Sequence, residues 1–511
     1  MSQNLQQLFE AIKKAQTAPI PDSIAKAFTQ SGSASTGLTY YDLEAPAKTL
    51  YPVLTPLRNR ISRVTGKAGT QANWRAITGI NVNNVAMGVS QGNRGGVIST
   101  TVTEYLAAYR GIGLEDYVTF EAEYAAEGFD DVKARAAEGL LRSVMIGEES
   151  LIFGGNTSLQ LGTTPTPTLA ASGSGGSLAT QTLSVICVAL AFEAYWAVAG
   201  LNNGATGQQF LAPSAVVPAS ITRTNSDGSS DTFGGGSGRK SSNATVSVTG
   251  PTGSATATVT AVNGAVGYAW YWGAAGSELL GAISTINSVK ITATATGTQT
   301  AASMPAADNS TNALEFDGLL TQSFKSGSGS YVKTMASGTP GTGTPLTSDS
   351  SGGIVEIEDA FNYFWTLYRL SPDTILMNSQ ELLNINKKIL NAGGAAPLVR
   401  FNVDVNNPMA VMNSMAAGIA IGSYLNKITN KLVKLEVHPN CPPGTMFFYS
   451  EQLPYKISGV NEVLRVLCRR DYYQIEWPIV KRRYEYGVYA DEVLQNYFPP
   501  AFGIITNIAN G

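Results

Sequence analysis

The chain has 511 residues, of which 43% are hydrophobic and 14% charged, and its formal net charge is −3. This balance excludes intrinsic disorder, and the length is enough for roughly three or four domains. The charge excludes both the basic stripe of a tight duplex-binding protein and a polybasic membrane signal. No apolar run approaches the ~20 residues that span a bilayer, so we predict no membrane partner.

The first two segments are predicted to be a leader and an extended arm. In residues 1–39, four apolar residues at three- and four-residue spacing predict a short amphipathic helix: Leu5, Leu8, Phe9 and Ile12. Residues 1–14 lack the apolar core of a secretion signal, so we expect the chain to be made in the cytosol. In residues 40–66, three prolines favour an extended arm that lies along another surface: Pro46, Pro52 and Pro56.

Residues 67–115 predict a long two-stranded loop. Residues that favour β-strands fill 71–77 and 97–109, and the stretch between them is polar and rich in glycine. An isolated hairpin is marginally stable in water, so this one needs a surface to lie on.

A strand followed by one long helix is predicted next. The run LEDYVTFEAEY, residues 114–124, predicts an acidic strand. Apolar residues at helical spacing then predict an amphipathic helix from about Glu127 to Ile152. Acidic residues crowd its start, where the helix dipole favours them, and two glycines follow its end: Glu127, Asp130, Asp131, Gly154 and Gly155. Residues 164–180 are predicted to be a low-complexity linker.

A β-rich insert is predicted over residues 206–312, which are dominated by Ser, Thr, Gly and Ala. It follows an apolar run, residues 183–200, that predicts a strand entering a short helix. Four short alternating runs predict a small β-sandwich: residues 245–250, 255–262, 267–273 and 289–297. The aromatic run at 262–273 resembles the central strand of immunoglobulin-like modules, but the paired cysteines of antibody domains are missing. We expect residues 243–300 to form a self-contained sandwich.

Regular structure is predicted again in the C-terminal third. Apolar residues at helical spacing predict a helix over 357–368, and SPDTILMN, residues 371–378, predicts a buried strand. Asn378 with Glu381 three residues later predicts a capping box for the helix that follows. A change in the parity of the apolar residues near Pro478 predicts a bulge or a strand break.

Side chains that could carry chemistry are few. The single histidine, His438, adjoins a proline turn, and we interpret it as a surface-turn residue rather than a catalytic one. The run GGGSGRKSS, residues 234–242, resembles a phosphate-binding loop, but Arg239 interrupts the required order and a flexible hairpin loop explains it better. The cysteines are far apart and fit small buried hydrophobes: Cys187, Cys441 and Cys468.

Five carboxylates gather just before the predicted long helix: Glu121, Glu123, Glu127, Asp130 and Asp131. They suggest a divalent-cation or glycosidase site, but stabilisation of the helix start and ion pairing between subunits explain them without chemistry. We therefore predict no catalytic residue, no metal site and no cofactor.

The order of these elements resembles the major capsid proteins of tailed bacteriophages of the Hong Kong 97 type. The resemblance rests on YYDLEAPAKTLYPVLTPLRNRIS, residues 71–110, residues 127–152, SPDTILMNSQELLNINK, VHPNCPPGTMFFY and YEYGVYADEVLQNYFPPAFGIITNI. It implies an α+β fold that carries an immunoglobulin-like β insert. The implied parts are a leader (1–39), an N-terminal arm (40–66), an extended β loop (67–115), a peripheral domain with its spine helix (116–175), the start of the axial domain (176–205), the insert (206–312), the axial domain (313–440) and closing peripheral strands (441–511).

The resemblance implies a structural role without enzymatic activity. Many copies would assemble into pentamers and hexamers and close an icosahedral head around double-stranded DNA. The implied partners are copies of the chain itself, packaged DNA by non-specific proximity, and scaffold, portal and cement or decoration proteins. The implied location is the virion capsid, after assembly in the host cytoplasm. Two alternatives stay open: a secreted or surface β-sandwich binding protein such as an adhesin, and an enzyme such as a glycan hydrolase.

Contacts between subunits are expected at four residues: Arg58, Arg94, Glu121 and Glu123. Arg94 is the cation at the tip of the extended loop, and we expect it to meet Glu121 or Glu123 of a neighbouring subunit. Some capsid proteins of this type join a loop lysine to an asparagine of the next subunit. No lysine lies between Lys67 and Lys133, so we predict that this loop forms no such cross-link.

Overall fold

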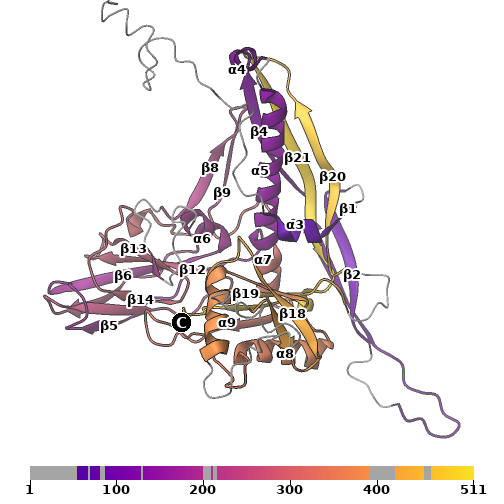
Figure 1. The fold of residues 1–511 in the computed structure, drawn as a ribbon. Coiled ribbons are helices and arrows are strands. Elements are labelled where there is room, and N and C mark those ends of the chain that lie inside the picture. Colours follow the sequence, from indigo (N-terminus) through magenta and orange to yellow (C-terminus); the bar gives the residue numbers. More distant parts are fainter. Residues whose placement is uncertain are drawn as a thin grey trace, which may run out of the picture. The chain divides into compact units, whose positions relative to one another are not determined.

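The computed structural model describes residues 54–66, 69–80, 87–127, 130–199, 209–210, 216–391, 421–453 and 462–510. The predicted N-terminal helix and the first half of the predicted arm lie outside these residues. The described part contains α-helices and β-strands in several separate sheets (Figure 1), which is the predicted α+β class. The chain divides into two compact units: Met1–Pro52 with Phe120–Lys133, and Val53–Thr119 with Ala134–Gly511.

The first unit is described over α4 (Phe120–Ala126) and the first residues of α5 (Val132–Gly154). Lys133 Nζ lies 2.6 Å from Glu123 Oε1, so an ion pair joins α4 to the start of α5. The second half of the predicted acidic strand is therefore wrong, because FEAEYAA contains strong helix formers and folds as a helix. The predicted long helix also begins at Val132 instead of near Glu127.

In the second unit, the described end of the arm forms one strand of a four-stranded sheet. Its strands, in spatial order, are β1 (Ser62–Thr65), β20 (Leu464–Glu476), β21 (Arg483–Asn496) and β4 (Arg110–Thr119). β1 runs parallel to β20, and the other neighbours are antiparallel. The strand break predicted near Pro478 is confirmed as the reversal between β20 and β21. A short helix, α3 (Pro56–Arg60), precedes β1 and begins with proline, whose fixed φ suits that position.

The predicted two-stranded loop is confirmed as a hairpin of β2 (Gln71–Ile80) and β3 (Thr100–Ala108). Trp74 and Tyr105 face each other across the two strands, and their ring centroids lie 5.8 Å apart in a stacked arrangement. Trp74 Nε1 also donates a hydrogen bond of 3.0 Å to the carbonyl oxygen of Asn496 at the end of β21. The base of the hairpin is thus fixed to the four-stranded sheet.

Helix α5 runs alongside this sheet (Figure 1). Leu140, Val144 and Ile152 are buried at multiples of four residues, which places them on one face of the helix. The helix ends at Gly154, the first of the two glycines predicted to follow it. A Cβ atom at Gly154 would lie 2.1 Å from the ring of Phe192, so only glycine allows this ring to lie against the helix end.

A β module is built from two sheets with a core of aliphatic and aromatic side chains between them. One sheet has the order β10 (Ala244–Val248), β6 (Gln181–Leu190), β12 (Gly267–Gly273), β13 (Leu279–Ser284) and β7 (Gln209–Phe210). The other has the order β14 (Ser288–Ile291), β11 (Ser254–Thr258) and β5 (Thr168–Ser172). Each of the four predicted runs overlaps a strand of this module: β10, β11, β12 and β14.

Two expectations about this module are wrong. Strand β6 pairs with β10 on one side and β12 on the other, so residues 243–300 are not a self-contained sandwich. Strand β5 lies inside the predicted low-complexity linker and pairs with β11. The backbone of TLAAS forms the hydrogen bonds of an edge strand. Its small side chains show little alternation of polar and apolar residues, so the sequence did not indicate a strand. A separate hairpin of β8 (Ser220–Thr224) and β9 (Ser230–Gly234) lies between β7 and β10 in the chain.

Within the glycine-rich run at 234–242, residues 235–238 and Ser241 are buried, so the run is not the freely exposed loop that was expected. Gly236 donates a backbone hydrogen bond of 2.9 Å to Asn309 and accepts one of 2.8 Å from Ala191. A Cβ atom at Gly236 would lie 2.5 Å from the backbone nitrogen of Ala194, and its φ is +86°. Glycine is needed here because two segments approach this backbone closely.

A six-stranded mixed sheet completes the unit. Its order is β15 (Tyr331–Thr334), β22 (Gly503–Thr506), β19 (Met446–Tyr449), β16 (Thr374–Met377), β18 (Lys431–Val437) and β17 (Ser423–Asn426). The remaining helices are α6 (Phe192–Ala199), α7 (Leu319–Phe324), α8 (Val355–Tyr368), α9 (Ser379–Asn391), η1 (Ala301–Ser303) and η2 (Pro499–Ala501).

The predicted helix over 357–368 and the buried strand over 371–378 are confirmed by α8 and β16. The capping box is confirmed only in part. Asn378 Oδ1 accepts the Gln380 N–H at 3.0 Å, as an N-cap residue should, but Glu381 Oε1 accepts the Gly444 N–H at 2.8 Å instead of turning back to the cap.

Candidate assembly interface

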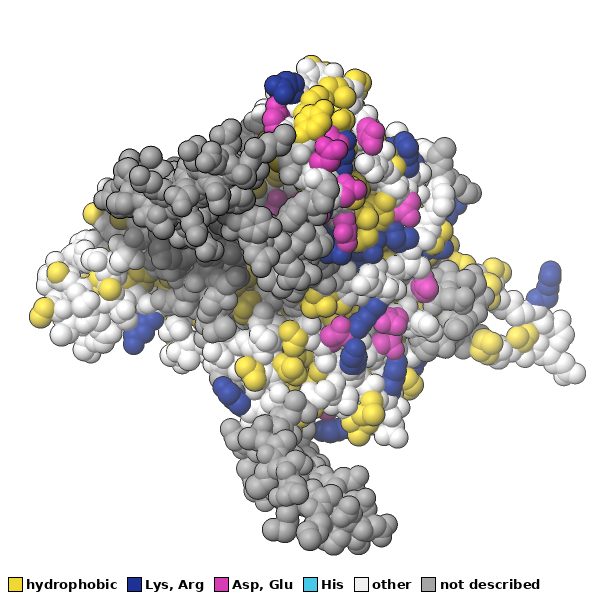
Figure 2. Space-filling model, turned by 45° about the horizontal axis from the view of Figure 1, so that its top comes forward, with side chains coloured by type: hydrophobic (Ala, Val, Ile, Leu, Met, Phe, Trp, Pro, Cys, Tyr) yellow, Lys and Arg dark blue, Asp and Glu magenta, His cyan; other side chains and the backbone are white. Residues whose placement is uncertain are grey.

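The β2–β3 hairpin exposes an unusual number of large apolar side chains. We call them the hairpin surface: Ile77, Met87, Val89, Val97, Ile98, Val102 and Leu106. Val97 is 89% exposed and Leu106 is 72% exposed. Figure 2 shows yellow side chains spaced along the hairpin, which extends to the right of the view. Side chains of this kind on a projecting hairpin are typical of a surface that another molecule covers.

The tip of the hairpin is shaped by a turn. Asn93 donates its backbone N–H to the Ser90 carbonyl at 3.1 Å, and its side-chain amide donates to Ser90 Oγ at 2.6 Å. Arg94 follows this turn and is exposed. Of the acids expected to meet it in a neighbouring subunit, Glu121 and Glu123 lie on α4, and Glu123 pairs with Lys133.

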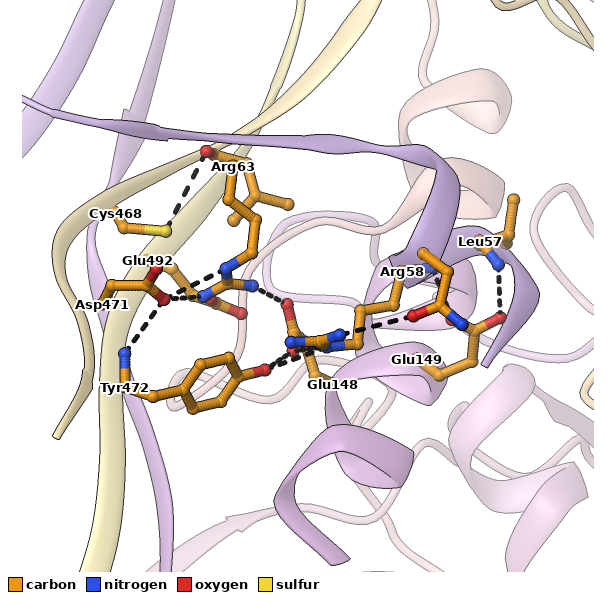
Figure 3. A network of polar contacts seen from close by, with 11 residues as sticks. Leu57, Arg58, Arg63, Glu148, Glu149, Cys468, Asp471, Tyr472 and Glu492 are labelled. Carbon is orange, nitrogen blue, oxygen red and sulfur yellow. Dashed lines mark hydrogen bonds and ion pairs between the residues drawn. The ribbon is translucent and has the colours of Figure 1, made fainter. Parts of the chain in front are cut away.

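A partly buried polar network joins the described end of the arm to α5 (Figure 3). We call it the anchor cluster: Arg58, Arg63, Glu148, Glu149, Asp471, Tyr472 and Glu492. Glu149 accepts the backbone N–H groups of Leu57 at 2.9 Å and Arg58 at 2.7 Å, so its carboxylate binds the open amides at the start of α3. Arg58 Nε donates to Glu148 Oε2 at 2.9 Å. The charge of Arg58, expected at an intersubunit contact, is thus matched inside the chain.

Arg63 lies between two carboxylates that are both fully buried. Its Nη1 bonds Glu148 Oε1, and its Nη2 lies 2.7 Å from Glu492 Oε2. Burial raises the pKa of Glu148, although Arg63 and Arg58 oppose the shift. Burial, followed by the charge of Glu148, raises the pKa of Glu492 to about 8, and Arg63 opposes this too.

The interpretation of His438 as a surface-turn residue is wrong, because its side chain is fully buried. Its Nε2 lies 2.7 Å from Glu149 Oε1, and its Nδ1 accepts the backbone N–H of Asn440 at 3.2 Å. Because Nδ1 accepts a hydrogen bond, the ring N–H is placed at Nε2, which donates a hydrogen bond to the Glu149 carboxylate. The ring also stacks on Phe153 at 4.9 Å, so His438 holds the end of α5 against the loop after β18.

Sequence reasoning missed the acids of the anchor cluster. Glu148 continues the four-residue spacing of Leu140, Val144 and Ile152, so it falls within the apolar stripe of α5. A charged residue in such a stripe is the signal that could have found it, since buried acids need a partner. The three cysteines are buried and free, as predicted: Cys187, Cys441 and Cys468.

Among the residues that the structure describes, no three His, Cys, Asp or Glu side chains are placed to hold a metal ion. Over the same ranges, no helix combines the length and the apolar character needed to cross a membrane.

No family model and no curated protein matches the sequence. The structure is similar to the capsid of a native GTA particle, with 6% identity and a TM-score of 0.41 over 92% of this chain and 96% of that chain. It is similar to the capsid of Myoviridae phage XM1, with 10% identity and a TM-score of 0.39 over 92% and 97%. The capsid of cyanophage P-SCSP1u gives 6% identity and a TM-score of 0.38 over 97% and 100%. All three are described as capsids.

Proposed function

We propose that this chain is a structural capsid subunit of the Hong Kong 97 type, which assembles as pentamers and hexamers into an icosahedral head around double-stranded DNA. The observation that carries the proposal is the hairpin surface, a two-stranded ribbon with apolar side chains exposed along its length. A shell is closed by repeated contacts between identical subunits, and a projecting apolar ribbon supplies such a contact.

The energetics favour a covered hairpin. Burying one exposed Val, Leu or Ile side chain contributes about 1.5–3 kcal/mol, so covering several of them offsets the cost of bringing two subunits together. A two-stranded ribbon without a third strand is marginal on its own. Contact with a neighbouring subunit would therefore stabilise the hairpin and the assembly at once.

The proposed partners follow from this role. Arg94 at the hairpin tip is proposed to meet Glu121 or Glu123 of a neighbour, where a charge-assisted hydrogen bond would set the register of the contact. Packaged DNA would lie close without specific recognition. Scaffold, portal and cement or decoration proteins are the further partners proposed, in a virion capsid assembled in the host cytoplasm.

Size-exclusion chromatography with negative-stain microscopy of the purified full-length chain tests this function. We expect capsomers or shells from the wild type. The double variant Val97→Ser with Leu106→Ser should stay monomeric with an unchanged thermal melt, because both side chains are already exposed in the subunit. Val480→Ser is the matched control, since Val480 is 85% exposed outside the hairpin, and it should assemble normally. A wild-type chain that stays monomeric at every concentration would favour the binding-protein alternative.

A further inference from the structure

We propose that a groove on the four-stranded sheet binds a neutral oligosaccharide, whose sugar rings stack on Tyr489 and Trp477. We call it the sheet groove. It lies between the turn of the β8–β9 hairpin and the face of β4, β20 and β21 that carries Tyr489, and its volume is about 950 Å³. This volume is at the upper end of the range of ligand clefts, roughly 300–1,000 Å³. The inference does not depend on the proposed capsid role, because it concerns a site within one chain.

The floor of the sheet groove contains an aromatic ring that lies against the sheet surface. Tyr489 on β21 faces Gly113 on β4 in the strand register, and Gly487 precedes it by two residues on the same face. A Cβ atom would lie 2.2 Å from the Tyr489 ring at Gly113 and 2.6 Å from it at Gly487, so a side chain at either position would displace the ring. Glycine weakens the interior of a strand and often marks a close approach. The two glycines therefore provide the seat of this ring.

Glu115 on β4 joins this ring to the wall of the groove. The hydroxyl of Tyr489 donates a hydrogen bond to Glu115 Oε1, and the hydroxyl of Ser226, in the β8–β9 turn, donates one to Glu115 Oε2. These two bonds orient the ring and hold the turn at the sheet. Because an ionised carboxylate has about four lone-pair sites, Glu115 can still accept hydrogen bonds from a ligand.

A second ring lies further along the same face of the sheet. Tyr473 on β20 faces Tyr489, with their ring centroids 6.0 Å apart, and Trp477 follows four residues later, where it is 41% exposed and lines the groove. Arg470 already stacks on Tyr473 at 3.7 Å, so Tyr489 and Trp477 are the rings left for a ligand. Four strand residues span roughly 13 Å at ~3.3 Å each, so these two rings can contact different sugar units of one chain.

The charges of the lining favour a neutral ligand with many hydroxyl groups. Three cations and three acids line the groove: Arg223, Lys481, Arg483, Glu115, Asp227 and Glu485. A nucleic-acid backbone needs an excess of cations, and a purely apolar ligand would remove water from these charges without replacing its hydrogen bonds.

A sugar ring suits both parts of the lining. Its C–H face packs on an aromatic face, while the hydroxyls around its edge exchange hydrogen bonds with carboxylates and cations. A β-1,4-linked chain is extended and flat, so it can follow the sheet surface from Tyr489 to Trp477. The sheet groove therefore fits a neutral β-1,4-linked oligosaccharide.

Isothermal titration calorimetry of the full-length chain tests the sheet groove. Cellohexaose and chitohexaose are neutral β-1,4-linked chains, and we expect a Kd below about 1 mM for at least one of them. Maltohexaose, whose α-1,4 linkages coil the chain, and octathymidylate, which can stack but carries phosphates, should each bind at least about tenfold more weakly. The proposal is overturned if neither β-1,4-linked chain binds at about 5 mM, or if octathymidylate binds more tightly than both.

Variants of Trp477 locate the binding in this groove. Trp477→Ala should weaken binding by at least about tenfold with an unchanged thermal melt, and Trp477→Phe, which keeps a ring, should recover most of the loss. Trp365→Ala on α8 is the matched control, since Trp365 is 38% exposed outside the groove, and it should bind as the wild type does. Unchanged binding by Trp477→Ala, or an equal loss in Trp365→Ala, would overturn the assignment to the sheet groove.

Discussion

Glu381 is a buried acid that pairs with no Lys or Arg side chain among the residues that the structure describes. Its side chain is fully buried at the start of α9, Oε1 accepts the Gly444 N–H at 2.8 Å, and Oε2 has no partner in the described part of the chain. Burial raises its pKa to about 7, and the hydrogen bond from the Gly444 N–H opposes the shift. The folded state therefore holds a proton that the unfolded chain loses above its ordinary pKa of 4.5.

We expect Glu381→Gln to stabilise the subunit at alkaline pH. The wild type loses stability as the pH rises from about 4.5 to about 7, because the folded state binds more protons than the unfolded state in this window. The variant avoids this loss, so its free energy of unfolding should exceed that of the wild type by up to about 3 kcal/mol at pH 8. At about pH 4.5 the difference should nearly vanish. Urea unfolding at both pH values measures it, and an equal gain at both would contradict the titration argument.

Arg94 gives a prediction about assembly rather than folding. Arg94→Glu should raise the subunit concentration needed for half-assembly by about tenfold or more, which corresponds to ~1.4 kcal/mol. Arg94→Lys keeps the charge and should recover most of the loss. Light scattering against concentration measures assembly, and the thermal melt of the monomer should not change because Arg94 is exposed. Equal damage to the monomer would instead place Arg94 in a contact within its own chain.

Single residues were predicted from the sequence only where the deciding contact is local. Asn378 was correctly placed at a helix start because its partner, Gln380, is two residues away. His438 was misplaced because its partner, Glu149, is 289 residues away, and the prolines around it indicated only a turn. The anchor cluster was missed for the same reason.

At the scale of elements, strand β6 holds the β module together. Leu183 to Leu190 are all buried, and the strand has a partner on both sides. Replacing residues 243–300 by a short Gly/Ser linker removes both partners and leaves a bare apolar strand, so we expect an insoluble chain. Expression followed by separation of soluble and insoluble fractions measures this.

The control for that deletion is the β8–β9 hairpin. Its strands pair with each other and with no other strand in the described residues, and most of its side chains are exposed. Replacing residues 221–233 by a short linker should leave a soluble chain. If the 243–300 replacement is also soluble, the module does not need its central sheet.

Elements with strong periodicity were predicted well. The β2–β3 hairpin, α8 and the four β runs of the insert were predicted because the spacing of their apolar residues is visible in the local sequence. β13 was missed and β5 was assigned to a linker, since small or mixed side chains give little alternation. The recruitment of β6 into the sheet depends on pairing between distant segments, which local patterns do not encode.

For the whole molecule, we predict that assembled particles contain no covalent bond between subunits. No lysine lies between Lys67 and Lys133, so the hairpin has no amine side chain for an isopeptide bond. The three cysteines are buried and free, which removes the disulfide alternative. Particles boiled in reducing SDS should give one band at the mass of the chain or slightly below it. A ladder of multimers would contradict this.

The parallel pairing of β1 with β20 also sets an order of folding during synthesis. Arg63 and Asp471, which bond across these two strands, are separated by 408 residues. At ~5–20 residues per second, a ribosome needs roughly 20 to 80 s between the two. The arm therefore has no docking strand until the subunit is nearly complete, and a chain that stops before residue 464 can never dock it. The pairing of β1 with β20 thus restricts docking of the arm to subunits whose synthesis is nearly finished.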